Sequence, residues 1–118
     1  MSLNRPPFNV VQGVELFAPG FWQAFVWHIN DSASKIRAPT TATSWYRNEA
    51  ENQRVGGAQD SQHLVGAAVD LVNERAGQLA NELTGRGFVV VNEGDHLHVQ
   101  AWPAGLIRSV GLLDYLGY

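Results

Sequence analysis

Two short runs of β-branched and apolar residues in the C-terminal third of the chain constrain the fold most. Residues 88–92 read FVVVN, residues 96–102 read HLHVQAW, and Glu93-Gly94 begins the short connection between them. Valine-rich runs are typical of strands, and a short glycine-containing connection between two of them indicates a hairpin. The chain must therefore contain a sheet, and at least part of that sheet is antiparallel.

The predicted helices follow from apolar residues at three- and four-residue spacing. Residues 19–30 have this spacing from Phe21 to Ile29. Residues 73–85 have it too, with Asn73 placed to cap the start and glycines placed to end the helix. The apolar face of this second helix is expected to comprise Val72, Leu79 and Leu83.

Weaker signals complete the prediction of an α+β fold, a small, mainly antiparallel sheet with flanking helices. Pro6 and Pro7 disfavour a helix, so residues 1–13 are expected to be an extended arm. Residues 36–44 are rich in threonine and predict a strand, which Pro39 favours at a sheet edge. The other expected elements are a short helix at 48–54, a strand or short helix at 65–72, and a short helix at 106–115.

Composition excludes several classes of protein. The 118 residues suffice for one domain, and 45% of them are apolar, which is typical of a globular core. A formal net charge of −3 without a basic run argues against nucleic-acid binding. No uncharged apolar run reaches the ~20 residues of a membrane span, and the N-terminal residues lack the pattern of a secretory signal. The chain has no cysteine, so a metal would be held by histidine, aspartate and glutamate.

Three of the four histidines lie near acids. His96 and His98 are two residues apart in a predicted strand, so both face one side of the sheet, and Asp95 precedes them. His63 and Asp70 are separated by small residues that allow close approach of the backbone. Two imidazoles and one carboxylate form a recurring catalytic zinc set, and zinc accepts such nitrogen and oxygen ligands. A His-x-His pair by itself more often marks two polar surface residues, so the pair alone leaves both interpretations open.

The order of short motifs along the chain is more specific than any one of them. The chain reads SWYR at 44–47, GG at 56–57, SQH at 61–63, GAAVD at 66–70 and DHLH at 95–98. This order closely resembles the zinc D-alanyl-D-alanine carboxypeptidases and L-alanyl-D-glutamate endopeptidases. That family includes the vancomycin-resistance D,D-peptidases and several phage endolysins, and it shares its fold with the Hedgehog signalling domain. The resemblance extends over about residues 36–102.

The resemblance implies a role for each matching residue. His63, Asp70 and His98 match the three zinc ligands of the family. Asp95 matches the general acid/base, a position where many members have glutamate. His96 matches an extra histidine that some members place beside the metal, where it would stabilise the tetrahedral intermediate.

Two further residues match positions that contact substrate. Arg47 matches the arginine that holds a substrate carboxylate or carbonyl, and Ser61 matches a serine that touches the substrate. A planar two-pronged donor suits a carboxylate, which makes the arginine chemically apt. Arg47 has a structural alternative, as a surface arginine that pairs with a nearby glutamate.

The spacing of Asp95 and His98 raises a difficulty, because residues three apart on a regular strand point to opposite faces. Asp95 reaches the site only if it precedes the strand on the Gly94 turn, or if a bulge intervenes. Glu93 is therefore a second candidate base. The structural alternative for Asp95 is a turn residue that bonds its own backbone.

The resulting hypothesis is a zinc peptidase that hydrolyses an amide bond in peptidoglycan stem peptides, as a D,D-carboxypeptidase or an L,D-endopeptidase. Residues 1–18 would be an N-terminal arm and residues 19–118 a single zinc peptidase domain. The missing secretory pattern favours a phage or prophage enzyme that is made in the cytoplasm and reaches the wall at lysis or within a virion.

Two alternatives belong to other classes of function. The chain could be a catalytically weak or inactive part of a phage tail or another assembly, with the arm, including Val10-Val11, docked on a phage structural protein. It could also be a zinc-stabilised binding domain without turnover. A full set of three ligands and an acid argues against an inactive scaffold.

Overall fold

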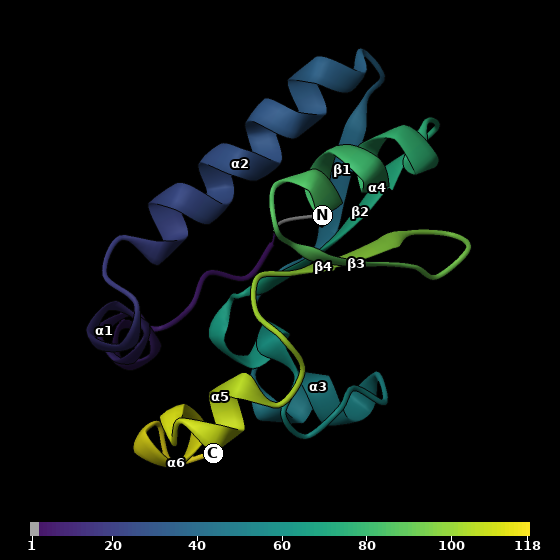
Figure 1. Ribbon diagram of the computed structural model, residues 1–118. Helices are drawn as coiled ribbons and strands as arrows, with labels where there is room; N and C mark the ends of the chain where they lie inside the picture. Colours follow the sequence, from purple (N-terminus) through teal and green to yellow (C-terminus); the bar gives the residue numbers. More distant parts are fainter. Residues whose placement is uncertain (1–2) are drawn as a thin grey trace.

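A four-stranded antiparallel sheet forms the middle layer of the molecule (Figure 1). The structure is a computed structural model that describes residues 3–118. Its strands are β1 (Thr40–Ser44), β2 (Ala68–Asn73), β3 (Val89–Asn92) and β4 (Leu97–Gln100). Their order across the sheet is β1-β2-β4-β3, and every neighbouring pair is antiparallel. The predicted α+β class and the predicted hairpin are both confirmed.

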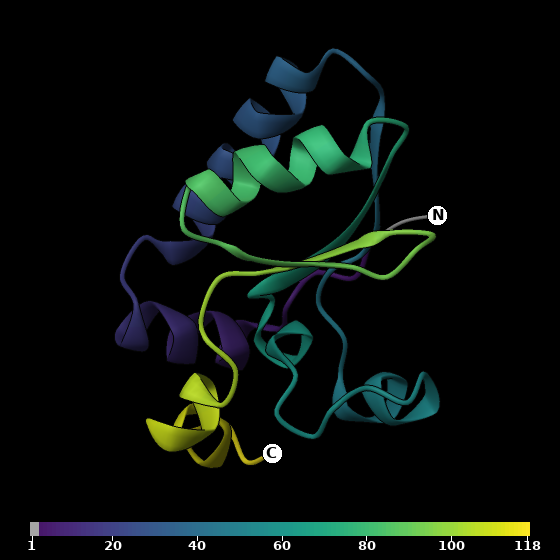
Figure 2. The same ribbon diagram turned by 45° about the vertical axis from the view of Figure 1, so that its right-hand side comes forward.

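Helices lie on both sides of this sheet. They are α1 (Phe8–Phe17), α2 (Phe21–Ile36), α3 (Glu49–Arg54), the 3-10 helix η1 (Gln62–Val65), α4 (Ala76–Gly85), α5 (Leu106–Ser109) and α6 (Leu112–Tyr115). Figure 2 shows α2 and α4 together on one side, whereas α1, α3, α5 and α6 lie on the other. Among the described residues, no helix combines the length and the apolar character that a membrane span requires.

The two central strands alternate residues of one apolar cluster with residues that face the opposite side of the sheet. Val69 and Leu71 of β2 and Leu97 and Val99 of β4 are buried in one apolar cluster. That cluster also contains buried residues of α2 and α4, namely Phe25, Ile36, Leu79 and Leu83. Because successive side chains of a strand point to opposite faces, the residues between these positions point away from α2 and α4.

A second apolar cluster supports η1. It brings together residues of η1, α1 and the C-terminal helices, which are Leu64, Val65, Val10, Val14, Ile107, Leu112 and Leu113. The short 3-10 helix is therefore held by packing as well as by its own backbone.

The N-terminal segment differs from the prediction. Residues 8–17 form α1 directly after Pro7, and Val10 and Val14 are completely buried. Proline is excluded from the interior of a helix but tolerated at its start, so the two prolines precede the helix instead of preventing it. The expectation of an extended arm over residues 1–13 is wrong for residues 8–13, and Val10 is not available for docking.

Several boundaries also differ from the prediction. Helix α2 continues to Ile36 and ends at Arg37, whose φ of 57° is left-handed, so β1 begins only at Thr40. Asn73 is the last residue of β2, and its side chain accepts a hydrogen bond from the backbone of Arg75, just before α4. The placement of Val72 with Leu79 and Leu83 is wrong, because Val72 lies on β2 and is 41% exposed.

Candidate metal centre

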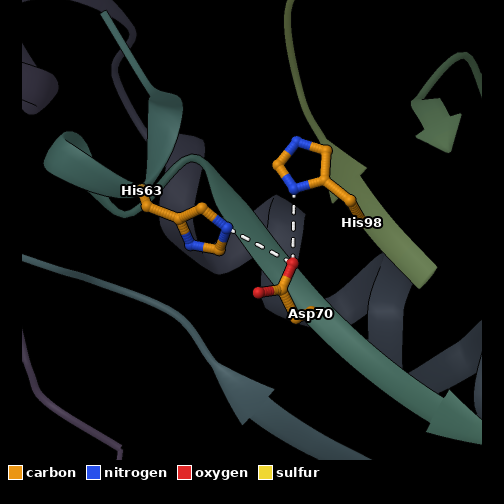
Figure 3. Close-up of side chains that lie close together, drawn as sticks. All are labelled: His63, Asp70 and His98. Carbon is orange, nitrogen blue, oxygen red and sulfur yellow. Dashed lines mark hydrogen bonds and ion pairs between the residues drawn. The ribbon is translucent and has the colours of Figure 1, made fainter. Parts of the chain in front are cut away.

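Three separate elements bring the predicted ligands together. His63 comes from η1, Asp70 from β2 and His98 from β4. Asp70 and His98 are direct partners in the β2–β4 register, so their side chains share the face that points away from α2 and α4. One ligand atom from each of the three residues lies within 4.8 Å of the others (Figure 3).

Asp70 is the centre of this cluster. Its Oδ1 lies 3.3 Å from His63 Nε2 and 3.3 Å from His98 Nδ1. Burial raises the pKa of the Asp70 carboxyl, but contacts with His63, His98 and His96 outweigh burial and hold that pKa well below its usual range. The carboxylate is therefore charged at neutral pH and suited to a cation.

The environment of His63 fits zinc. Its ring is completely buried, and Nδ1 lies 2.6 Å from the Trp45 carbonyl oxygen. A carbonyl only accepts hydrogen bonds, so Nδ1 carries the hydrogen and Nε2 has a free electron pair. His63 Nε2 has no hydrogen-bond partner among residues 3–118, although it faces the Asp70 carboxylate. Two electron-pair donors thus face each other, and a bridging cation would satisfy both.

His98 is held from two sides. Nδ1 faces Asp70, and Nε2 lies 2.9 Å from the side-chain oxygen of Gln100. The contact with Asp70 raises the pKa of His98, and burial opposes that rise without cancelling it. The His98 ring is half-buried, so it lies at the boundary between the protein interior and the open face of the sheet.

Asp95 lies before β4, next to Gly94, and not within a bulge. This is one of the two positions from which we expected it to reach the site. It belongs to the bend at residues 94–96, where Gly94 has a φ of 95°. The Asp95 side chain is 90% exposed and contacts His96, with 2.7 Å between its Oδ1 and His96 Nδ1. This hydrogen bond is the main cause that lowers the pKa of Asp95. Asp95 is thus outside the three-residue cluster.

His96 reaches the cluster from the same bend. Its Nε2 lies 3.8 Å from Asp70 Oδ1, while its Nδ1 is held by Asp95. The structure therefore places His96 between the exposed carboxylate and the candidate metal ligands.

Two cavities flank the cluster, and Arg47, Glu93 and His98 line both of them. One cavity, of about 290 Å³, lies on the side of Ser61, and the other, of about 560 Å³, lies on the side of Trp45. Cavities on both sides of the ligands suit an extended substrate that crosses the site.

Arg47 lines both cavities. Burial lowers the pKa of its guanidinium, and the charges of Asp70 and Glu51 oppose that effect. Arg47 Nε is buried and makes no hydrogen bond to any residue that the structure describes. The backbone N–H of Arg47 donates to the carbonyl of His63, which ties the arginine to η1.

Ser61 has a structural contact of its own. Its hydroxyl caps η1 by accepting a hydrogen bond from the His63 backbone N–H. The residue also lines the smaller cavity, so its predicted contact with substrate remains a prediction.

Sequence reasoning assigned no role to several residues that support the ligands. Gln100 contacts His98, the Trp45 carbonyl contacts His63, and Gln62 bonds the backbone of Trp102. A signal for Gln100 was present, because it lies two residues after His98 on a strand and therefore faces the same side. Contacts through backbone carbonyls leave no such signal, because any residue type supplies one.

Comparison with known proteins supports the resemblance at the family level. The model of the family described as Peptidase M15 matches residues 9–100. No curated protein and no solved structure matches the chain. The family match extends over most of the chain and includes every residue of the cluster. The chain belongs to the Peptidase M15 family, and this membership supports a peptidase of the metallopeptidase class.

Proposed function

We propose that this protein is a zinc peptidase that hydrolyses an amide bond in peptidoglycan stem peptides. The observation that carries the proposal is the buried Nε2 of His63, which has no hydrogen-bond partner among residues 3–118 and faces the charged Asp70 carboxylate in a chain of the Peptidase M15 family. His63, Asp70 and His98 would hold the ion. Zinc, when bound, supplies a Lewis acid that polarises a carbonyl and makes a water more acidic.

Asp95 and His96 have separate roles in cleavage of the peptide bond, proton transfer and stabilisation of negative charge. The Asp95 carboxylate accepts a proton from the attacking water and delivers it to the amine nitrogen as the carbon–nitrogen bond breaks. His96 donates from Nδ1 to Asp95, and as an imidazolium, with a hydrogen on both nitrogens, it would also donate from Nε2 to the oxygen of the scissile carbonyl as negative charge develops. The overall reaction consumes one water and leaves a carboxylate and an amine.

Glu93 is the second candidate for the proton transfer. It lines both cavities together with His98, whereas Asp95 lines neither of them. Asp95 remains the first choice, because its position matches the acid of the family and because it directly contacts His96.

Arg47 would bind a carboxylate or carbonyl of the peptide. It lines both cavities, is partly desolvated and has a buried Nε without a hydrogen-bond partner among the described residues. A guanidinium in such a place binds a carboxylate more strongly than one in water, because competing water is reduced. Ser61, in the smaller cavity, would contact the backbone of the same peptide.

The bond that is cut defines the enzyme more closely. The resemblance supports a D,D-carboxypeptidase or an L,D-endopeptidase, and likeness to phage endolysins supports action in phage lysis or as part of a virion. The two cavities beside the cluster are compatible with either cut.

The test combines metal analysis with product analysis. Purified protein is expected to contain one zinc per chain and to release soluble peptides from peptidoglycan, and a chelator should stop that release. Masses of the released peptides identify the bond. The variant His98→Gln should lose both zinc and activity, whereas His28→Gln, on the helix α2 away from the cluster, should keep both.

Zinc without products on several types of peptidoglycan would overturn the peptidase and favour a binding or structural role. Products that resist a chelator, from protein shown to be free of metal, would overturn the zinc mechanism.

A further inference from the structure

A chain of hydrogen bonds continues from His98 to the backbone of Trp102. The side-chain oxygen of Gln100 lies 2.9 Å from His98 Nε2, and the side-chain nitrogen of Gln100 donates to the Trp102 carbonyl at 2.9 Å. The same carbonyl accepts a second hydrogen bond, of 2.6 Å, from the side-chain nitrogen of Gln62.

The chemistry of these groups fixes the direction of every bond in the chain. A backbone carbonyl has no hydrogen to donate, so the Gln100 amide must present its nitrogen to Trp102. Its oxygen then faces His98, and an amide oxygen only accepts. His98 Nε2 therefore carries a hydrogen, and in the neutral ring the electron pair is then on Nδ1, the nitrogen that faces Asp70.

The Trp102 peptide group, to which Gln100 donates, is also hydrogen-bonded to Gln62. Gln62 is only 4% exposed and makes two hydrogen bonds to the Trp102 backbone. Its side-chain nitrogen donates to the Trp102 carbonyl, and its side-chain oxygen accepts from the Trp102 N–H at 3.0 Å. Gln62 belongs to η1, the element that carries His63. The Trp102 backbone is thus connected to both candidate histidine ligands, to His98 through Gln100 and to the η1 helix of His63 through Gln62.

Asp70 acts on His98 in the opposite sense. Its carboxylate lies 3.3 Å from Nδ1 and would favour a hydrogen on that nitrogen, where a metal has to bind. Gln100 supplies the competing contact on the other side of the ring. Without Gln100, the contact with Asp70 would favour the tautomer with hydrogen on Nδ1. Among the described residues, no other acceptor would favour the tautomer with hydrogen on Nε2.

On the basis of the zinc site described above, we propose that Gln100 is a positioning residue that keeps the hydrogen of His98 on Nε2 and so directs Nδ1 to zinc. Partners of this kind behind a metal-bound histidine typically change metal affinity by about 10–100-fold when they are removed.

The test compares two substitutions of similar size. Gln100→Met removes the acceptor, whereas Gln100→Glu keeps an acceptor opposite His98. Zinc affinity of the full chain, measured by competition with a chelator of known affinity, should fall about 10–100-fold in Gln100→Met. It should fall less in Gln100→Glu, which keeps an acceptor for His98 Nε2 but, like Gln100→Met, loses the donation to the Trp102 carbonyl. Gln78→Met, at an exposed position of α4, is the matched control and should bind zinc as the wild type does.

A spectroscopic signature separates hydrogen bonding from a loss of packing or a change of charge. In zinc-loaded protein with ¹⁵N-labelled histidine, the Nε2–H proton of His98 should be visible and slow to exchange in the wild type and in Gln100→Glu. It should exchange rapidly in Gln100→Met. Circular dichroism of each variant establishes that the chain is folded.

Equal zinc affinity and equal exchange of this proton in Gln100→Met and the wild type would overturn the proposal. So would an equal loss of affinity in Gln100→Met and Gln100→Glu. Both measurements use metal and protein only, so failure of the proposed peptidase activity would leave this result unaffected.

Discussion

The Asp95 carboxylate contacts His96, which is not one of the three clustered ligands, so its role can be tested separately from metal binding. Asp95→Ala should lower turnover about 10²–10⁴-fold, the usual contribution of a general acid/base. Zinc content should not change, because Asp95 is not among the clustered ligand atoms. Peptide release and zinc content measured on the same sample check both expectations. Asp114→Ala, an exposed acid of α6, is the control.

A fully active Asp95→Ala enzyme would exclude Asp95 as the base and direct attention to Glu93, which lines both cavities. Loss of zinc together with activity would instead show that Asp95 supports the metal site.

The raised pKa of His98 predicts how zinc binding depends on pH. A proton on Nδ1 competes with the metal, so affinity should fall as pH decreases through the pKa of His98. Because contact with Asp70 raises that pKa, the fall should begin above the ordinary histidine value of about 6.5. Zinc affinity measured between about pH 9 and pH 6 checks this expectation. A constant affinity across that range would contradict it.

The residues of the cluster could be predicted from the sequence, but their support could not. Residue types, order and spacing identified His63, Asp70 and His98, and the structure brings these three together. The carbonyl of Trp45 was not predictable as the partner of His63, because a backbone group has no signature in the sequence. The contact between Asp95 and His96 was also missed, because two adjacent residues on a bend have no fixed relative direction.

At the scale of elements, α1 is part of the core of the protein. Val14→Ala should lower the free energy of unfolding by about 1–3 kcal/mol, because the removed methyl groups are fully buried. Leu16→Ala, two residues further along the same helix, should change it by less than about 0.5 kcal/mol, because Leu16 is 72% exposed. Urea unfolding of both variants provides the measurement. Equal stability of the two would show that α1 does not pack on the core in solution.

Elements with a clear period were predicted well, and elements set by tertiary packing were not. The hairpin of β3 and β4 followed from valine-rich runs around a turn. Helix α1 was missed because two prolines precede it, and its stability comes from the burial of Val10 and Val14. Residues 65–72 were left open between a strand and a short helix, and the structure has Val65 at the end of η1, residues 66–67 in a connection and residues 68–72 in β2. Such small apolar residues fit either conformation, so packing decides.

At the scale of the whole molecule, zinc would join parts of the chain that are distant in sequence. Saturating zinc, at about a thousand times its dissociation constant, should stabilise the fold by about 4 kcal/mol. For a domain of this size, the midpoint of thermal unfolding should then rise by on the order of 10 °C. Thermal unfolding with added zinc and with a chelator measures this rise. Asp70→Asn should reduce it strongly, and an unchanged rise in that variant would contradict the ligand assignment.

The sheet separates two apolar clusters, and the candidate site lies at the boundary between them. One cluster lies between the sheet and helices α2 and α4, and the other surrounds η1. His63 is anchored in the second cluster through its neighbours Leu64 and Val65, while Asp70 and His98 extend from strands whose opposite face belongs to the first. Rigid supports on both sides suit a site that must keep a fixed geometry.

The alternation of core and site residues along β2 and β4 limits where residues can be inserted into or deleted from this chain during evolution. Inserting or deleting one residue within β4 would turn His98 toward the helices and expose Leu97 or Val99, so both the core and the site would be lost. The connection at residues 93–96 lies outside the strands, and a change of length there leaves the pairing of β4 with β2 intact. Because the same connection carries Asp95 and His96, a change of length there would still move both residues relative to His98, so related chains should keep its length as well as that of the two strands.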